Sequence, residues 1–401
     1  MHPIIPDTAD TARVRAPKLF AASMLWLACV AYLFFLGMPA FVAQMGEGWH
    51  YTASQQGLVA MAEVAGNALG ALLLVYVIPG RTALLTFACG LLALVSGNAA
   101  MIADPPIELA LAERLLAGVG GGMVAGTAVR YLSLDRRADT LLTLMVLCQY
   151  LGMVLLVAVV APRLGSIGQS LALCAVLAAL SLPVLLFFTD RQKVAGESTS
   201  GQPVAVRAGS AWLVLVSMFF LYMTGGVAWT FLDSVGVAAG LSQEQVSSSV
   251  AVAAGPTVLV CLGMPLLLRK GLALPACLVL LAACATGAFV LSRPLTPWLL
   301  AAGTVALFVG WAAGGVALYA ILPAYDPVGR HIALIPAFGG IGSALGSAAG
   351  GYLIEQSSSP SLAYQFGALS GVLAIAAIVA ASWLAARRPV PSGAEVGGSQ
   401  R

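Results

Sequence analysis

Charged residues are scarce in this sequence. Asp, Glu, Lys and Arg make up only 9% of the 401 residues, whereas a soluble domain carries about 25%. Hydrophobic residues make up 60%, and the mean hydropathy is +0.96. This composition excludes a soluble globular protein and is typical of an integral membrane protein, so the first expected partner is the lipid bilayer.

Groups that carry catalytic or metal chemistry are also few. The three histidines, His2, His50 and His331, are scattered and have no acidic residue at motif spacing, which argues against a polytopic membrane enzyme. The seven cysteines lie in apolar runs without metal-site spacing. No Gly-x-x-x-x-Gly-Lys-Ser/Thr run is present, so we expect no ATP hydrolysis. We expect no catalytic residue, no metal and no cofactor. Because the basic residues form no stripe, we also expect no nucleic-acid partner.

Long apolar runs predict an all-α integral membrane fold with twelve transmembrane helices. The predicted spans lie near residues 19–43, 53–78, 82–103, 107–131, 140–161, 168–188, 211–236, 245–268, 272–292, 297–322, 332–354 and 362–386. An Asp-Pro-Pro run at residues 104–106 ends the third span. Thr52-x-x-Gln55 and Ser242-x-x-Gln245 predict capping boxes that open the second and eighth spans.

One long polar break divides the chain and predicts a flexible linker. The predicted parts are a tail at 1–18, a six-helix bundle at 19–188, the linker at 189–210, a second bundle at 211–386 and a tail at 387–401. The two halves match weakly at an offset of 188 residues, for example Ser54-Gln55 with Ser242-Gln243. This match predicts two six-helix bundles related by duplication.

The basic residues predict the orientation of the chain. Apart from Arg114 inside the membrane and Arg163 and Arg293 on the outside, the Lys and Arg residues lie on one side of the predicted spans. The positive-inside rule makes that side the cytoplasm. We therefore expect a multi-pass protein of the inner (plasma) membrane with both termini in the cytoplasm.

The chain is organised around one stretch of the fourth span. Arg114 lies ~10 Å into this helix, where a charge is costly unless it faces protein or water. Gly118, Gly122 and Gly126 share one face at small-xxx-small spacing, so another helix can pack closely there. Arg114 is then either a structural residue that pairs with a nearby acid or carbonyl, or part of a transport route.

The run Arg114-x-x-x-Gly118-x-Gly120-x-Gly122 resembles the signature on the fourth helix of the major facilitator superfamily. The resemblance covers residues 19–386. It implies two pseudo-symmetric six-helix bundles, a substrate site near the midplane at their interface, and alternating access.

Other segments fit this family unevenly. In the loop after the second span only Gly80-Arg81 is kept, and Val77 stands where the family has an aspartate. The fifth span lacks the Gly-Pro-x-x-Gly-Gly run of drug/proton antiporters. The loop at residues 326–330 resembles a loop of some bacterial members and is expected to be a simple turn. The eleventh span is better kept, since three glycines predict a close-packing face: Gly342, Gly346 and Gly350.

Acids within the spans are the candidate proton sites. Glu63 lies ~14 Å from the outer end of the second span and shares a face with Gln56, Asn67 and Gly70. A carboxylate at a site of low dielectric binds a proton more readily than in water, so Glu63 is the first candidate for proton coupling. The alternative is that it only bonds a neighbouring helix. An ion pair with Arg114 would reduce the burial cost of both.

Asp233, near the outer end of the seventh span, is the second candidate for proton coupling. Because it lies only one turn from the end, a solvated carboxylate is the alternative. His331 opens the eleventh span at the cytoplasmic face, where we expect an interfacial residue rather than a proton relay. Glu108 and Glu355, at span ends, are also expected to be interfacial.

The resemblance implies that the first, fourth, seventh and tenth spans line the central cavity. The candidate cavity residues are Arg114, Tyr32, Asn67, Gln149, Trp229, Trp311 and Tyr319. Aromatic side chains there would stack on a planar or cationic solute, and lipid-facing aromatic residues are the alternative.

These observations predict a monomeric secondary transporter that couples protons to the movement of a small organic solute. Arg114 favours a solute with an anionic group. A polytopic membrane enzyme and a transport-inactive sensor or scaffold with the same fold remain as alternatives.

Overall fold

The computed structural model describes residues 17–74, 83–133, 135, 137–187, 208–326, 331 and 334–387. These residues form helices and short connections, with no β-strand among them. The chain separates into two compact units, Met1–Ser198 (unit 1) and Thr199–Arg401 (unit 2). The boundary falls within the predicted linker. Most of that linker and nearly all of both predicted tails lie outside the described residues, so the bounds of the bundles stay predictions.

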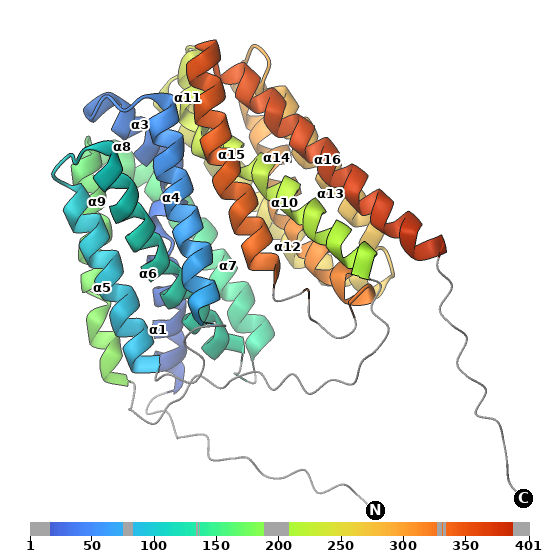
Figure 1. Cartoon of the computed structure of the whole chain (residues 1–401), viewed down its shortest axis with the longest axis horizontal. Coiled ribbons are helices and arrows are strands. Elements are labelled where there is room, and N and C mark those ends of the chain that lie inside the picture. Colours follow the sequence, from blue (N-terminus) through green and yellow to red (C-terminus); the bar gives the residue numbers. More distant parts are fainter. Residues whose placement is uncertain are drawn as a thin grey trace, which may run out of the picture. The chain divides into compact units, whose positions relative to one another are not determined.

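The helices of unit 1 occupy the first six predicted spans (Figure 1). They are α1 (Pro17–Val30), α2 (Leu33–Leu36), α3 (Met38–Gly48), α4 (Ala53–Leu72), α5 (Ala83–Met101), α6 (Ile107–Ser133), α7 (Ala138–Val154), a π-helical segment (Leu155–Val160), α8 (Ala161–Leu164), α9 (Ile167–Ala179) and a 3-10 segment (Leu182–Phe187).

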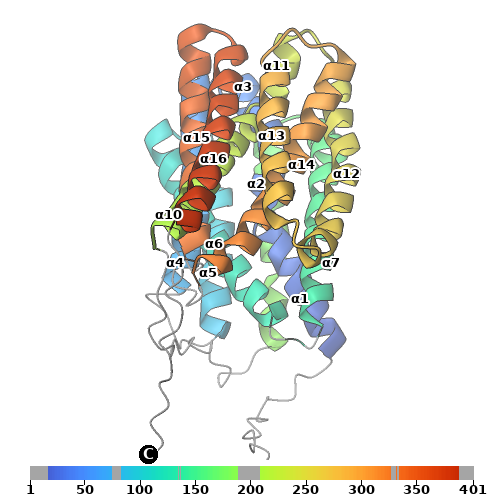
Figure 2. The ribbon, with the colours of Figure 1, turned by 90° about the vertical axis from the view of Figure 1, so that its right-hand side faces the viewer.

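The helices of unit 2 occupy the other six predicted spans (Figure 2). They are α10 (Ala208–Thr230), α11 (Leu232–Ala238), α12 (Gln243–Arg269), α13 (Ala273–Leu291), α14 (Pro297–Ile321), a 3-10 turn (Leu322–Ala324), α15 (Ile335–Ser357) and α16 (Pro360–Arg387).

Nine helical segments in the described part of the chain are long and apolar enough to cross a bilayer. The three other predicted spans are the interrupted first one, α4 and α15. Polar side chains lower the hydropathy of α4, and Gly and Ser lower that of α15. The predicted all-α membrane fold is confirmed, and the helices are consistent with twelve spans.

The structure corrects two of the predicted spans. The first, expected to be one helix over 19–43, turns at Tyr32 and Gly37 and continues to Gly48. Pro39 lacks a backbone N–H, and its ring would clash with the carbonyl four residues earlier in a continuous helix. Pro183 acts in the same way in the sixth span, where α9 ends at Ala179, four residues before this proline.

Both predicted capping boxes are confirmed. The Thr52 hydroxyl accepts a hydrogen bond from the backbone N–H of Gln55, and the Gln55 side chain accepts one from the backbone of Thr52. Ser242 and Gln245 make the same pair of bonds at the start of α12. Each box pairs two backbone donors that an uncapped helix end would leave without partners.

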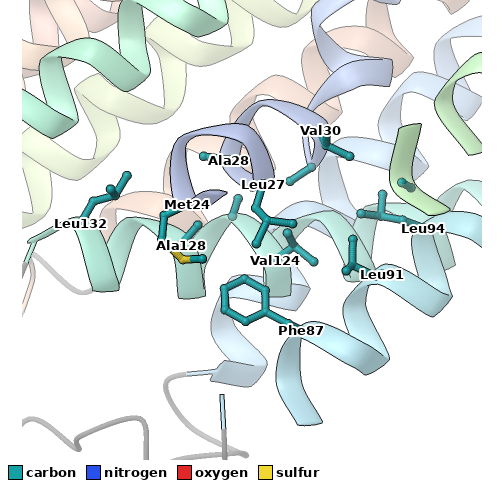
Figure 3. Close-up of a cluster of buried hydrophobic side chains, with 13 residues drawn as sticks. Met24, Leu27, Ala28, Val30, Phe87, Leu91, Leu94, Val124, Ala128 and Leu132 are labelled. Carbon is teal, nitrogen blue, oxygen red and sulfur yellow. The ribbon is translucent and has the colours of Figure 1, made fainter. Parts of the chain in front are cut away.

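The core of unit 1 forms where α1, α5 and α6 meet. Figure 3 shows that their apolar side chains point toward one another. Leu27 of α1, Phe87 and Leu91 of α5 and Val124 of α6 are each 0% exposed. Dispersion contacts between such close-packed side chains hold α6 at the centre of the unit.

Glycine lets α4 and α6 approach backbone to backbone (Figure 1). A Cβ on Gly118 would lie 3.0 Å from the Cα of Gly66, and one on Gly122 would lie 2.9 Å from the backbone nitrogen of Ala71. Gly126 is less tightly packed, since a Cβ there would meet only the side chain of Leu74. This crossing leaves no room for larger residues at its centre.

The glycine face of α15 packs against α10 in unit 2. A Cβ on Gly342 would lie 3.1 Å from the Cα of Phe219, and one on Gly346 would lie 3.1 Å from the Cα of Met223. Gly350 meets the ring of Phe231 instead.

The internal repeat has an offset of 190 residues, so the expected offset of 188 is wrong. Helix α4 begins at Ala53 and α12 at Gln243, α5 and α13 begin at 83 and 273, and α6 and α14 begin at 107 and 297. The cap Ser242 therefore corresponds to Thr52, not to Ser54. Short identities between common residues such as Ser and Gln arise by chance, whereas these three helix starts repeat in one register.

Candidate functional site

The candidate site of unit 1 is centred on an ion pair between α4 and α6. The Arg114 Nη1 atom lies 3.5 Å from the Glu63 Oε2 atom, and the side chains are 0% and 1% exposed. The glycine crossing explains this contact, because Glu63 lies one turn before Gly66 and Arg114 one turn before Gly118. The structure thus brings together two residues whose contact the sequence could not establish.

Two further helices contribute to the surroundings of Arg114. Its Nη2 atom donates a hydrogen bond of 3.0 Å to Asn98 Oδ1 on α5. Its guanidinium carbon lies 4.5 Å from the centre of the Phe34 ring on α2, within the range of a cation–π contact. On the other side of the pair, Asn67 Nδ2 lies 3.5 Å from Glu63 Oε1. Arg114 is therefore held by an anion, an amide and an aromatic face at once.

Sequence reasoning missed two members of this cluster, Asn98 and Glu113. Glu113 precedes Arg114, is 9% exposed and interacts electrostatically with its guanidinium. Asn98 is 3% exposed, and its amide also donates to the Leu94 carbonyl. The sequence does contain a signal for both residues, because each is a polar residue within an apolar span. Only the register between α5 and α6, set by Gly97 against Ala117, shows that Asn98 reaches Arg114.

Two of the contacts of Arg114 do not involve Glu63. Arg114 keeps Asn98 and Phe34 as partners whether or not Glu63 is ionised. Leaving a buried charge entirely without a partner would cost about 3–5 kcal/mol. The additional contacts reduce that cost, so both charge states of Glu63 are compatible with a folded unit 1.

Asp233 is buried in unit 2, so the solvated alternative is wrong. Its side chain is 0% exposed, and its Oδ2 atom accepts a hydrogen bond of 2.8 Å from Gln243 Nε2 at the start of α12. Thr230 precedes Asp233 by three residues, and its hydroxyl lies 2.8 Å from the hydroxyl of Ser347 on α15. The turn between α10 and α11 folds Asp233 inward, away from the solvent that its sequence position suggested.

His331 is also buried, which corrects its expected interfacial position. It is 5% exposed, its Nδ1 atom lies 3.3 Å from Asp326 Oδ2, and its backbone N–H donates to the same carboxylate. Its ring packs edge-on against Trp212, with centroids 5.3 Å apart. The sequence analysis found no acidic residue at motif spacing from His331, yet the structure pairs His331 with Asp326 in space. Residues 327–330, the rest of the expected turn, lie outside the described residues.

The predicted cavity residues differ in their surroundings. Trp229 is 2% exposed and packs against Phe308, with centroids 5.3 Å apart, which favours a packing role. Gln149 donates to the Ala28 carbonyl at 3.3 Å, and the Tyr32 ring meets Phe35. Trp311 is half-buried beside Tyr222, and Tyr319 is 43% exposed. The cavity assignment of these residues stays a prediction.

One expectation concerns residues beyond the described range, and another concerns two described residues. Gly80-Arg81 and Val77, the altered family loop, lie outside the described residues. Glu108 and Glu355 lie at helix ends and are exposed, in agreement with the positions expected for them.

Solved structures of transporters share this fold. A point mutant of the nucleoside transporter NupG superimposes with a TM-score of 0.72 at 15% identity, over 91% of this chain and 99% of that chain. A bacterial homologue of the human drug peptide transporters PepT1 and PepT2 has a TM-score of 0.64 at 14% identity, over 92% and 97%.

The chain has the fold of the major facilitator superfamily. A bacterial homologue of the human lysosomal transporter Spinster is also similar, with a TM-score of 0.62 at 12% identity over 92% of this chain and 96% of that chain. Neither a protein-family model nor a curated protein matches the sequence. With its apolar helices, the major facilitator fold makes this a multi-pass membrane protein.

Proposed function

We propose that the chain is a secondary transporter that moves a small organic solute across the inner membrane by alternating access. In this proposal protons are the coupling ion, the protein acts as a monomer, and both termini lie in the cytoplasm. The observation that carries the proposal is the fully buried Glu63–Arg114 pair in a chain with the major facilitator fold. Intramembrane ionisable pairs are costly and commonly belong to ion or solute pathways.

Glu63 is the proposed proton site. Protonation removes its negative charge, so the unit changes its net charge at a buried point while Arg114 remains held by Asn98 and Phe34. A proton shifts the balance between two transporter conformations only if it binds one of them more tightly, by ~1.4 kcal/mol for each tenfold difference in proton affinity. Asp233, buried beside Gln243, is the second proposed proton site.

For the solute, we propose only a chemical class. Arg114 has no exposed surface and already faces a carboxylate, so its charge no longer argues for an anionic solute. The similar structures include a nucleoside transporter and a homologue of peptide transporters. We therefore propose nucleosides and short peptides as the first compounds to test.

The proposal is tested in two steps. Purified protein is first screened against nucleosides, short peptides and other metabolites by thermal shift, because a compound that binds only the folded state raises the melting temperature. The best binder is then used in proteoliposomes with an imposed pH gradient. We expect gradient-driven accumulation in the wild type. Glu63→Gln should abolish it while leaving solute binding intact.

Glu108→Gln is the matched control, because Glu108 is an exposed acid at the start of α6. It should transport like the wild type. Accumulation at the normal rate by Glu63→Gln would make Glu63 structural and leave Asp233 as the proton site. Binding without transport in the wild type would favour the sensor or scaffold, and chemical conversion of the bound compound would favour an enzyme.

A further inference from the structure

A groove runs between α13 and α16 on the surface of unit 2. Its volume is about 530 Å³. Apolar side chains form its walls, and three of them are about half exposed: Phe289, Leu369 and Val372. Both helices are apolar enough to cross a bilayer, so the groove opens toward the lipid that surrounds unit 2.

Two of the residues that line the groove are small, Ala285 and Ala368. Gly371 packs against Ala285: a Cβ on Gly371 would lie only 2.7 Å from the Cβ of Ala285, so α13 and α16 approach closely at this point. We refer to these three residues as the floor of the groove. Large side chains on either side of this floor leave a valley along the crossing, which an extended hydrocarbon chain can fill.

One end of the groove is polar. Arg293 and Gln365 line it there, and Arg293 is the only charged side chain among the lining residues. The Arg293 guanidinium carbon lies 4.4 Å from the centre of the Phe289 ring, which holds the charge at the mouth of the groove. The Ser361 hydroxyl donates to the Ser292 carbonyl at 2.7 Å, so the polar ends of both helices lie at one level.

The groove is short enough to lie within one leaflet of a bilayer. From Gln365 to Val372 the groove extends seven residues along α16, which is ~10 Å at 1.5 Å per residue. Half of a hydrocarbon core of ~30 Å is ~15 Å. The charged mouth therefore lies near the headgroup level and the apolar part beside the acyl chains. On the predicted orientation this is the outer leaflet.

We propose that this groove is a binding site for an anionic phospholipid. The phosphate of the headgroup pairs with Arg293 and accepts a hydrogen bond from the Gln365 amide. One acyl chain lies over the Ala and Gly floor between Phe289 and Val372. The proposal needs a cation at the mouth and an apolar valley behind it, and the groove has both. It does not depend on the solute or on proton coupling.

The test uses the full-length protein in detergent micelles with equal amounts of phosphatidylglycerol and phosphatidylcholine of identical acyl chains. Bound lipid is counted by native mass spectrometry. We expect the wild type to retain phosphatidylglycerol about fivefold over phosphatidylcholine, which corresponds to the ~1 kcal/mol that one basic residue contributes at an anionic membrane surface. Arg293→Gln should reduce this ratio to about one.

Two pairs of variants separate charge from shape. Arg163→Gln removes the other outer arginine, on unit 1, and should keep the wild-type ratio. Val372→Trp fills the groove and should lower binding of both lipids, whereas Val379→Trp, two turns further along the same face of α16 and exposed, should not. An unchanged ratio in Arg293→Gln, or no preference in the wild type, would overturn the proposal. Displacement of the lipid by excess inorganic phosphate would show a simple anion site instead.

Discussion

Because Glu63 and Arg114 form a buried pair, we predict that the losses of stability caused by substituting each residue do not add when both are substituted. Arg114→Met removes the guanidinium and leaves a carboxylate that is 1% exposed without its counter-charge. Removing one partner of a buried pair costs about 3–5 kcal/mol. The variant also loses the hydrogen bond to Asn98, worth about 1.5–3 kcal/mol for a charged donor. Arg114→Met should therefore strongly destabilise unit 1.

The double variant Glu63→Gln/Arg114→Met should be more stable than Arg114→Met alone. Glutamine keeps the shape of Glu63 and its place beside Asn67, and the unpaired charge at residue 63 is removed. We expect a coupling free energy of about 0.5–3 kcal/mol, the range measured for directly interacting residues. For a unit of roughly 200 residues, each kcal/mol changes the melting temperature by about 2–4 °C.

The assay is thermal unfolding of the full-length chain in detergent. A dye that fluoresces on reaction with thiols reports unfolding, because Cys174 is buried in unit 1. The four proteins of the cycle are measured together. If the double variant loses as much stability as the two single variants combined, Glu63 does not offset the burial of Arg114, and the reasoning above is wrong.

Two further predictions concern packing and topology. Gly118→Leu should block folding or transport, because a Cβ there already meets the α4 backbone. The control Gly263→Leu has open space around it and should be tolerated. Expression and transport of both variants are measured, and normal behaviour of Gly118→Leu would contradict the prediction. A reporter fused after Lys193 should be cytoplasmic and one at Gly165 external, and an internal Gly165 would overturn the twelve-span topology.

Composition and hydropathy were sufficient to predict the fold class. The scarcity of charge and the regular apolar runs locate most helices to within a few residues, since the bilayer sets their length. Local signals with a defined geometry were also reliable, as the capping boxes at Thr52 and Ser242 show. The predicted spans took no account of prolines inside apolar runs. Pro39 and Pro183 mark helix breaks that hydropathy does not detect.

The surroundings of polar side chains were harder to predict, because they depend on contacts distant in sequence. Asp233 and His331 were placed by their distance from span ends, yet both are buried. Asn98 reaches Arg114 only through the register between two helices. A single sequence shows which residues are costly to bury, but it does not show which partners offset that cost.

The glycine crossings of unit 1 have a consequence for motion. Sliding between packed helices requires side chains to change rotamer, and backbone-to-backbone contacts at Gly66, Gly97 and Gly118 offer none to change. Helices α4, α5 and α6 should therefore move as one rigid body that carries Glu63 and Arg114 together. In the proposed transport cycle the distance between these two side chains then stays nearly constant. What would change in that cycle is the access of water and protons to them.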